Sequence, residues 1–278
     1  MILKSLPKRA RSSIAALALA SAAFASPAPV HANDLLVAPT RVVLNGSRGT
    51  EVILNNIGEE EATYRISLEL RRMTPDGGLE EVETANETEE AALGMIRYAP
   101  RRVVLPPNQP QSIRIGVRAP QDTPDGEYRV HMLFRAIPRP RPAAEQSETT
   151  GEGFQIRLIP IYGVTIPIIV RHGNLTATAA IANPRIVEEN GIRAIAFDLS
   201  RQGDRSVYGE VIVTRPGLDV PLAQARGVAV YAEIGTRSVT IPVSEDFAGN
   251  LAGPIRIQYR EPDNAGGGLI AETEAVLR

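Results

Sequence analysis

Residues 154–170 read Phe-Gln-Ile-Arg-Leu-Ile-Pro-Ile-Tyr-Gly-Val-Thr-Ile-Pro-Ile-Ile-Val. The run is rich in β-branched residues and long for one strand, so it predicts an extended segment. Proline has no backbone N–H and interrupts the hydrogen bonds of a central strand, so Pro160 and Pro167 place the segment at a sheet edge. The two prolines are an odd number of residues apart, and a bulge at Gly163 would turn both to the open side.

This predicted edge is long and hydrophobic. Proteins usually protect such edges, because an exposed edge pairs with other chains. We therefore expect residues 154–170 to pair with an incoming strand, whose main chain gives affinity while alternate side chains fill a groove. The alternative is a strand buried by a second domain or by a homodimer partner.

Short alternating segments, separated by Gly, Pro and Asn turns, surround this run on both sides. We expect strands at residues 35–44, 51–55, 63–73, 102–105, 111–118, 127–137, 175–182, 192–199, 208–214, 227–233, 237–242, 254–259 and 270–277. Strands without intervening helices predict an all-β fold of two antiparallel β-sandwiches. Residues 138–153 are polar and Pro-rich and predict a surface loop, and residues 171–174 resemble a linker. The predicted domains are residues 33–172 and 173–278.

The N-terminus predicts export. A basic start, an apolar run over residues 14–25 and a Val-His-Ala ending predict a signal peptide, residues 1–32, that is cleaved after Ala32. A membrane anchor is the alternative, but the run is short of the roughly 20 apolar residues that a span needs. Cleavage leaves 26 basic residues, all arginine, against 32 acidic ones, a net charge of −6. This charge argues against a nucleic-acid partner, and the absence of cysteine excludes disulfides.

The sequence contains no constellation typical of an enzyme. His31 is lost with the signal peptide, and His131 and His172 are isolated. There is no Gly-x-Ser-x-Gly motif and no phosphate-binding glycine loop. The acidic residues 80–90 lack the spacing of a calcium loop and predict a solvated loop. We therefore predict no enzymatic activity, no metal and no cofactor.

Several short motifs, in this order and spacing, resemble the periplasmic chaperones of pilus assembly. They are Pro39-Thr-Arg-Val-Val-Leu, Pro100-Arg-Arg-Val-Val-Leu-Pro-Pro-Asn-Gln-Pro-Gln-Ser-Ile-Arg-Ile, Asp125-x-Glu127, the long strand ending in Arg171, Gly203-Asp-Arg-Ser-Val-Tyr-Gly and Val228-Ala-Val-Tyr. The resemblance extends from about residue 35 to about residue 260. It implies two immunoglobulin-like domains at an angle, with a cleft between them.

The resemblance also implies a function in pilus (fimbrium) biogenesis and cell wall organisation. In this family an incompletely folded pilus subunit receives an edge strand of the chaperone, called donor-strand complementation, until an outer-membrane usher takes the subunit. The implied location is the periplasm, without a membrane span in the mature chain. By ungapped count, the donated side chains fall on Phe154, Ile156, Leu158, Pro160, Tyr162 and Val164.

The same resemblance implies an anchor and a charge cluster. The family holds the C-terminal carboxylate of the subunit with an arginine, matched by Arg41, and a lysine, whose position falls on Pro167. Either Arg41 serves alone, or another arginine substitutes, or the function has diverged; a solvated strand arginine is the alternative for Arg41. The family's interdomain charge cluster falls on Glu127, Arg171 and Asp263.

A function of another class is also compatible with the sequence. A structural immunoglobulin-like module of the cell surface or periplasm would use the same hydrophobic edge for self-association. Such a module would form a stable homo-oligomer. A homodimer of the free chaperone would also pair the exposed main-chain groups of this edge.

Overall fold

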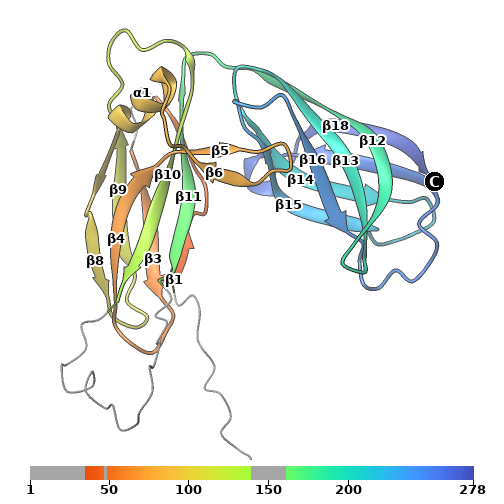
Figure 1. The fold of residues 1–278 in the computed structure, drawn as a ribbon, viewed down its shortest axis with the longest axis horizontal. Helices are drawn as coiled ribbons and strands as arrows, with labels where there is room; N and C mark the ends of the chain where they lie inside the picture. The colour runs from red at the N-terminus through yellow and green to blue at the C-terminus, as the bar shows by residue number, and fades with distance from the viewer. Residues whose placement is uncertain (1–34, 47–48, 139–160) are drawn as a thin grey trace, which may run out of the picture. The chain divides into compact units, whose positions relative to one another are not determined.

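The computed structural model describes residues 35–46, 49–138 and 161–278. Their regular structure is almost entirely β-strand, arranged as two sandwiches with separate hydrophobic cores (Figure 1). The predicted all-β class with two antiparallel sandwiches is confirmed. The domain limits, 33–172 and 173–278, and the angle between the sandwiches stay predictions, and the predicted signal peptide lies outside the described residues.

The first sandwich consists of two sheets. One has the order β1 (Leu35–Ala38), β3 (Thr50–Asn56), β9 (Gln111–Val117), β7 (Ile96–Ala99). The other has the order β2 (Val42–Asn45), β11 (Gly163–His172), β10 (Gly126–Ile137), β4 (Ala62–Glu69), β8 (Arg102–Leu105). Neighbouring strands are antiparallel except β2 and β11, which are parallel.

A helix, α1 (Glu87–Met95), lies where the sequence predicted a solvated acidic loop. The Asn86 side chain accepts a hydrogen bond from the N–H of Glu89, and the Glu89 carboxylate accepts one from the N–H of Asn86. Acidic residues in the first turn are favoured by the helix dipole, and Ala92 and Met95 are buried. The acidic run therefore starts a helix instead of remaining a loop. A short hairpin, β5 (Arg71–Met73) and β6 (Leu79–Glu81), precedes it.

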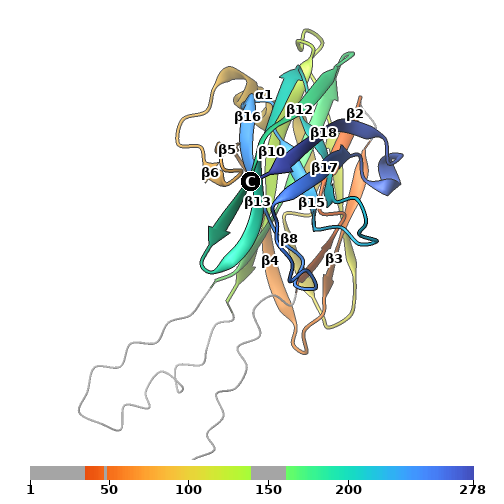
Figure 2. The ribbon, with the colours of Figure 1, turned by 90° about the vertical axis from the view of Figure 1, so that its right-hand side faces the viewer.

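The second sandwich has one sheet of β12 (Ala177–Glu189), β13 (Ile192–Gly203) and β16 (Thr236–Pro242). Its other sheet has the order β15 (Ala223–Val230), β14 (Val207–Thr214), β17 (Gly253–Arg260), β18 (Leu269–Leu277). Figure 2 shows β17 and β18 side by side; the 3-10 helix η2 (Asp263–Ala265) lies in the loop between them.

Strand β10 uses both of its faces. Alternation along a strand places even-numbered and odd-numbered side chains on opposite sides. The even-numbered residues from Tyr128 to Phe134 are buried in the first core. Glu127, Arg129 and His131 lie on the opposite face, where they meet residues of the second sandwich. This strand therefore connects the first core with the site described below.

Candidate functional site

The first element of the site is an unpaired stretch of β11. Strand β10 accompanies β11 from Gly163 to His172. On the other side of β11, β2 pairs with residues Ile168 to Arg171 alone. The stretch Gly163–Pro167, called the open edge here, has no second strand beside it among the residues that the structure describes.

The open edge directs main-chain groups away from β10. The N–H of Ala136 donates to the C=O of Tyr162, so the even-numbered residues of β11 are those bonded to β10. The N–H and C=O groups of Gly163 and Thr165 therefore point outward. Pro167 also faces outward, so its missing N–H costs no hydrogen bond to β10. The geometry leaves main-chain donors and acceptors for one more strand.

Within the described residues, which resume at residue 161, the strand runs from Gly163 to His172, and the predicted start at residue 154 lies outside them. Tyr162 lies just before it and is 40% exposed, and Val164 is half-buried against the first core. The other residues expected to be donated lie outside the described residues: Phe154, Ile156, Leu158 and Pro160.

The predicted bulge at Gly163 is wrong, because the register of β10 and β11 is continuous from Gly163 to His172. A Cβ atom at residue 163 would lie 2.9 Å from Cδ1 of Leu133. A side chain at residue 163 would therefore have to displace the end of the Leu133 side chain.

The second element is a pocket of about 620 Å³ beside the start of β2. Three arginines line it: Arg41, Arg171 and Arg205. Tyr208 and four residues of the loop between β17 and β18 also line it: Glu261, Pro262, Asn264 and Ala265. In the strand register Val42 lies opposite Ile168, so the pocket adjoins the end of the open edge. The arrangement brings positive charge to the point where the unpaired stretch stops.

Arg41 is half-buried and lacks an ion-pair partner among the described residues. Its Nη2 donates to Oγ of Ser206 at 3.4 Å, and its guanidinium lies 4.4 Å from the ring centre of Tyr208. Its Nη1 is buried with no hydrogen-bond partner in the described part of the chain. Burial lowers the pKa of the Arg41 guanidinium, although nearby Tyr231 and Glu127 act in the opposite direction. These contacts do not fit a solvated strand arginine.

At the wall of this pocket, Arg171 forms an ion pair with the buried carboxylate of Glu127. The Glu127 side chain is 1% exposed, and its Oε2 accepts hydrogen bonds from Nε of Arg171 at 3.1 Å and from Oγ of Ser206 at 2.9 Å. The N–H of Ser206 donates to the same oxygen, and Nη2 of Arg171 donates to the C=O of Ser206. The structure thus brings together two of the three residues expected in the charge cluster.

The third expected member, Asp263, lies elsewhere. It is exposed in η2 and forms no ion pair with Glu127 or Arg171 in the part of the chain that the structure describes. Ser206 contacts both residues of the pair instead. A neutral serine offers no charge pattern in the sequence, so only the fold could identify it.

The sequence also missed a second contact between the sandwiches. The two terminal guanidinium nitrogens of Arg129 donate to the Glu233 carboxylate, at 2.9 and 2.6 Å. The N–H of Met73 in β5 donates to the same carboxylate at 2.7 Å. The Arg129 guanidinium lies 3.7 Å from the ring centre of Tyr231. The alternation of charged residues along β10 was the one sequence signal that pointed to a contact on this face, but it does not identify the residues that are contacted.

His131, the isolated histidine of the predicted strand, is buried. It is 1% exposed, and neither ring nitrogen has a hydrogen-bond partner among the described residues. Burial, together with the charges of Arg129 and Arg71, lowers the pKa of His131 to about 3. The described residues also contain no group of three His, Asp or Glu able to hold a metal ion and no helix long and apolar enough to cross a membrane.

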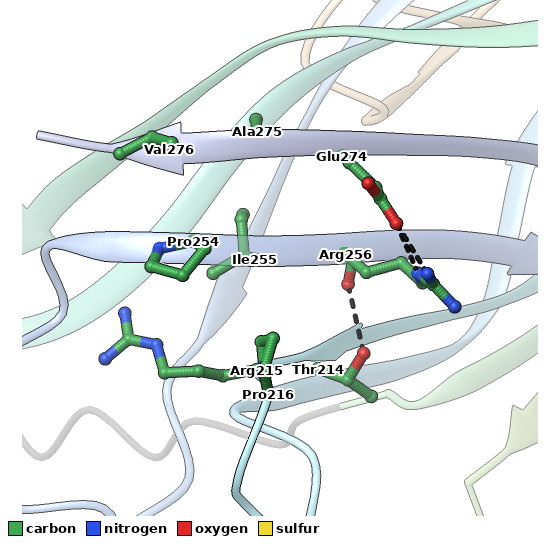
Figure 3. A pocket seen from close by; sticks show the side chains of 9 residues that line it. All are labelled: Thr214, Arg215, Pro216, Pro254, Ile255, Arg256, Glu274, Ala275 and Val276. Carbon is green, nitrogen blue, oxygen red and sulfur yellow. Dashed lines mark hydrogen bonds and ion pairs between the residues drawn. The ribbon is translucent and has the colours of Figure 1, made fainter.

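Another pocket, of about 510 Å³, lies on the second sandwich (Figure 3). Its charged side chains already have partners. Arg256 is paired with Glu274, and Arg215 donates to the C=O groups of Asn250 and Leu251. The pocket lined by Arg41 is therefore the stronger candidate for an anionic ligand.

Comparison with known proteins finds similarity at the level of fold. No protein-family model and no curated protein matches the chain. Among solved structures, that of the YadV chaperone is 12% identical with a TM-score of 0.46, covering 88% of this chain and 100% of that one.

Two similar structures are complexes. The CsuC–CsuE chaperone–tip adhesion subunit complex from Csu pili of Acinetobacter baumannii gives 12% identity and a TM-score of 0.44, over 88% and 98% of the two chains. The SafA pilin in complex with the SafB chaperone of Salmonella enterica gives 16% and 0.44, over 89% and 98%. Such low identities, with TM-scores below 0.5, leave the function of this chain to be argued from its own residues.

Proposed function

We propose that this chain is an exported, non-enzymatic chaperone of pilus or related surface-fibre assembly. It holds an incompletely folded subunit by strand donation in the periplasm and delivers it to an outer-membrane usher. The observation that carries the proposal is the open edge, Gly163–Pro167, which ends at a pocket lined by arginines. The open edge offers main-chain hydrogen bonds to a subunit strand, and the arginines of the pocket can bind a negative charge at the end of that strand.

The charges determine the direction of the incoming strand. β2 runs parallel to β11, and Arg41 immediately precedes it. A strand on the open edge that also runs parallel to β11 ends beside Arg41 with its C-terminal carboxylate. An antiparallel strand would bring its N-terminal ammonium to the same arginines, which is unfavourable. The subunit therefore binds through its C-terminal strand, with Arg41 as the carboxylate anchor.

The residues before the open edge extend the donated strand in this proposal. Their alternate side chains fill the subunit groove: Phe154, Ile156, Leu158, Pro160 and Tyr162. Val164 packs against the first core and marks the point where the strand joins its own sandwich. The buried pair of Glu127 and Arg171 is structural, because both residues hold Ser206 and so keep the wall of the Arg41 pocket in place.

The test is to remove one outward N–H from the open edge. Thr165→Pro deletes that donor without deleting a hydrogen bond to β10, whereas Thr165→Val loses only the hydroxyl contact to Glu69. Ala179→Pro is the matched control, because the N–H of Ala179 also points outward, from edge strand β12. Each variant is purified from the native periplasm, checked by thermal unfolding, and the co-purified proteins are identified by mass spectrometry.

We expect a small β-rich secreted subunit to accompany wild type, Thr165→Val and Ala179→Pro and to be absent from Thr165→Pro. Retention of the subunit by a folded Thr165→Pro variant would contradict strand donation through this edge. Wild-type dimers without any subunit, lost in Thr165→Pro, would instead establish the self-associating surface module.

A further inference from the structure

The pocket beside the open edge contains a donor without a partner. Nη1 of Arg41 is buried and forms no hydrogen bond within the described residues. A carboxylate has two oxygens and accepts several hydrogen bonds, so one guanidinium nitrogen alone leaves most of its capacity unused. A lysine cannot complete the site, because the two lysines of the chain, Lys4 and Lys8, lie in the predicted signal peptide and Pro167 occupies the expected position.

Arg171 does not supply the missing donors, because its own donors are already engaged. Its Nε donates to Glu127 and its Nη2 to the C=O of Ser206. Moving this guanidinium toward a ligand would leave Glu127 as a buried, unpaired carboxylate, which is costly.

Arg205 is in the opposite situation. It lines the same pocket as Arg41, is half-buried, and its guanidinium forms no hydrogen bond or ion pair in the described part of the chain. It belongs to the connection between β13 and β14 and immediately precedes Ser206, which Arg41 contacts directly. Its backbone is therefore fixed next to Arg41 while its charge remains unused.

Resting on the proposed function, we infer that Arg205 is the second cation that binds the C-terminal carboxylate of the subunit. The carboxylate anchor is then built from both sandwiches, with Arg41 supplied by the first and Arg205 by the second. Charge-assisted hydrogen bonds from two guanidinium groups satisfy both carboxylate oxygens. Binding of the subunit would thus depend on the second sandwich, although the open edge belongs to the first.

The negative charge of Glu261 should lower the affinity of this pocket for a carboxylate, and this effect can be measured. Glu261 is the one carboxylate among the residues lining the pocket, and it forms no ion pair with the three arginines. A like charge beside the site weakens the binding of an anion. Glu261→Gln should therefore tighten the binding of a carboxylate, while Arg205→Ala should weaken it.

The experiment compares two probe peptides, N-acetyl-Thr-Val-Thr-Val-Tyr with a free C-terminal carboxylate and the same peptide as the C-terminal amide. Each is titrated into the mature protein, and arginine Nε–H signals are followed by NMR, which detects millimolar binding. The variants are Arg41→Ala, Arg205→Ala and Arg205→Lys. Arg226→Ala is the control, because Arg226 is an exposed arginine already paired with Glu210.

Wild type and Arg226→Ala should bind the acid at least about tenfold more tightly than the amide. Arg205→Ala should lose most of this preference without changing the affinity for the amide, and Arg205→Lys should retain part of it. A full preference in Arg205→Ala, with its loss in Arg41→Ala, would overturn the role of Arg205 and leave the proposed anchor standing. No preference in wild type would overturn both.

Discussion

The two sandwiches treat their sheet edges differently. In the second sandwich, the pairings of three of the four end strands, β12, β15 and β18, each contain a register shift. The fourth end strand, β16, pairs regularly with β13, and the N–H of its Ser238 donates to the C=O of Pro75 in the turn between β5 and β6. In β12 the irregularity lies at Asn183 and Pro184, and Asn183 has a φ of 53°. Bulges and prolines of this kind prevent an edge from pairing with another chain.

The first sandwich protects its edges by another means. Its end strands β1, β7, β2 and β8 are each four residues long, and none of the described pairings in this sandwich contains a register shift. The shortness of β2 leaves the first half of the ten-residue β11 uncovered. The contrast teaches that the open edge differs from the other sheet ends, which are short, contain a register shift or, in β16, bond to the turn between β5 and β6.

The largest expected effect comes from Glu127, which fixes the beginning of β10, the strand that supports the open edge. Glu127→Ala leaves Arg171 and Arg41 without this buried carboxylate and should cost about 3 to 5 kcal/mol of unfolding free energy, measured by urea denaturation. Glu210→Ala removes the carboxylate partner of exposed Arg226 on the second sandwich and should cost far less. Equal losses in the two variants would show that the buried pair has no special role.

The next largest effect is a dependence of the unfolding free energy on pH. It arises from His131, which lies opposite Pro167 at the end of the open edge. Arg129, Arg71 and the edge of Tyr231 face or adjoin this histidine, and Glu69 lies across from it in β4. Its pKa in the folded protein, about 3, is below the ordinary value of 6.5, so the unfolded chain binds the proton first on acidification. Stability should therefore fall as the pH decreases from about 6.5 toward 3.

This loss should amount to about 3 kcal/mol between pH 7 and pH 4. His131→Phe should remove that part of the pH dependence, and His172→Phe, at the end of β11, is the control. The measurement is urea unfolding at several pH values. An unchanged slope in His131→Phe would mean that other groups cause the acid sensitivity.

Removal of the bulge in β12 should have the smallest effect on stability. It is also the most direct test of the difference between the sheet edges of the two sandwiches. Residues 183 and 184 stand opposite Phe197 alone, so deletion of Pro184 restores a regular register with β13. The repaired edge should associate with a second copy in a concentration-dependent manner, measured by light scattering. Pro184→Ala retains the extra residue and should stay unchanged; a monomeric deletion variant would show that the bulge does not protect this edge.

The strands were predictable because their side chains alternate between core and solvent. The pair of Glu127 and Arg171 was found through the resemblance, and the strand register places the two residues opposite each other. Asp263 was also taken from the resemblance, but it lies in a loop, where no strand register places it beside the pair. Helix α1 was missed because its capping box lies inside an acidic run that reads as a loop.

The sequence by itself determined the class of fold and the character of the long hydrophobic strand, because alternation and proline placement are local properties. Only the tertiary structure decided which part of that strand is open, because this depends on where the distant β2 stops pairing with it. It also decided that Ser206 joins the buried pair and that Arg205 meets Arg41 at one pocket. Those residues come from the other sandwich: Ser206 is 79 positions from Glu127 and 165 positions from Arg41 along the chain. No local pattern encodes such a meeting.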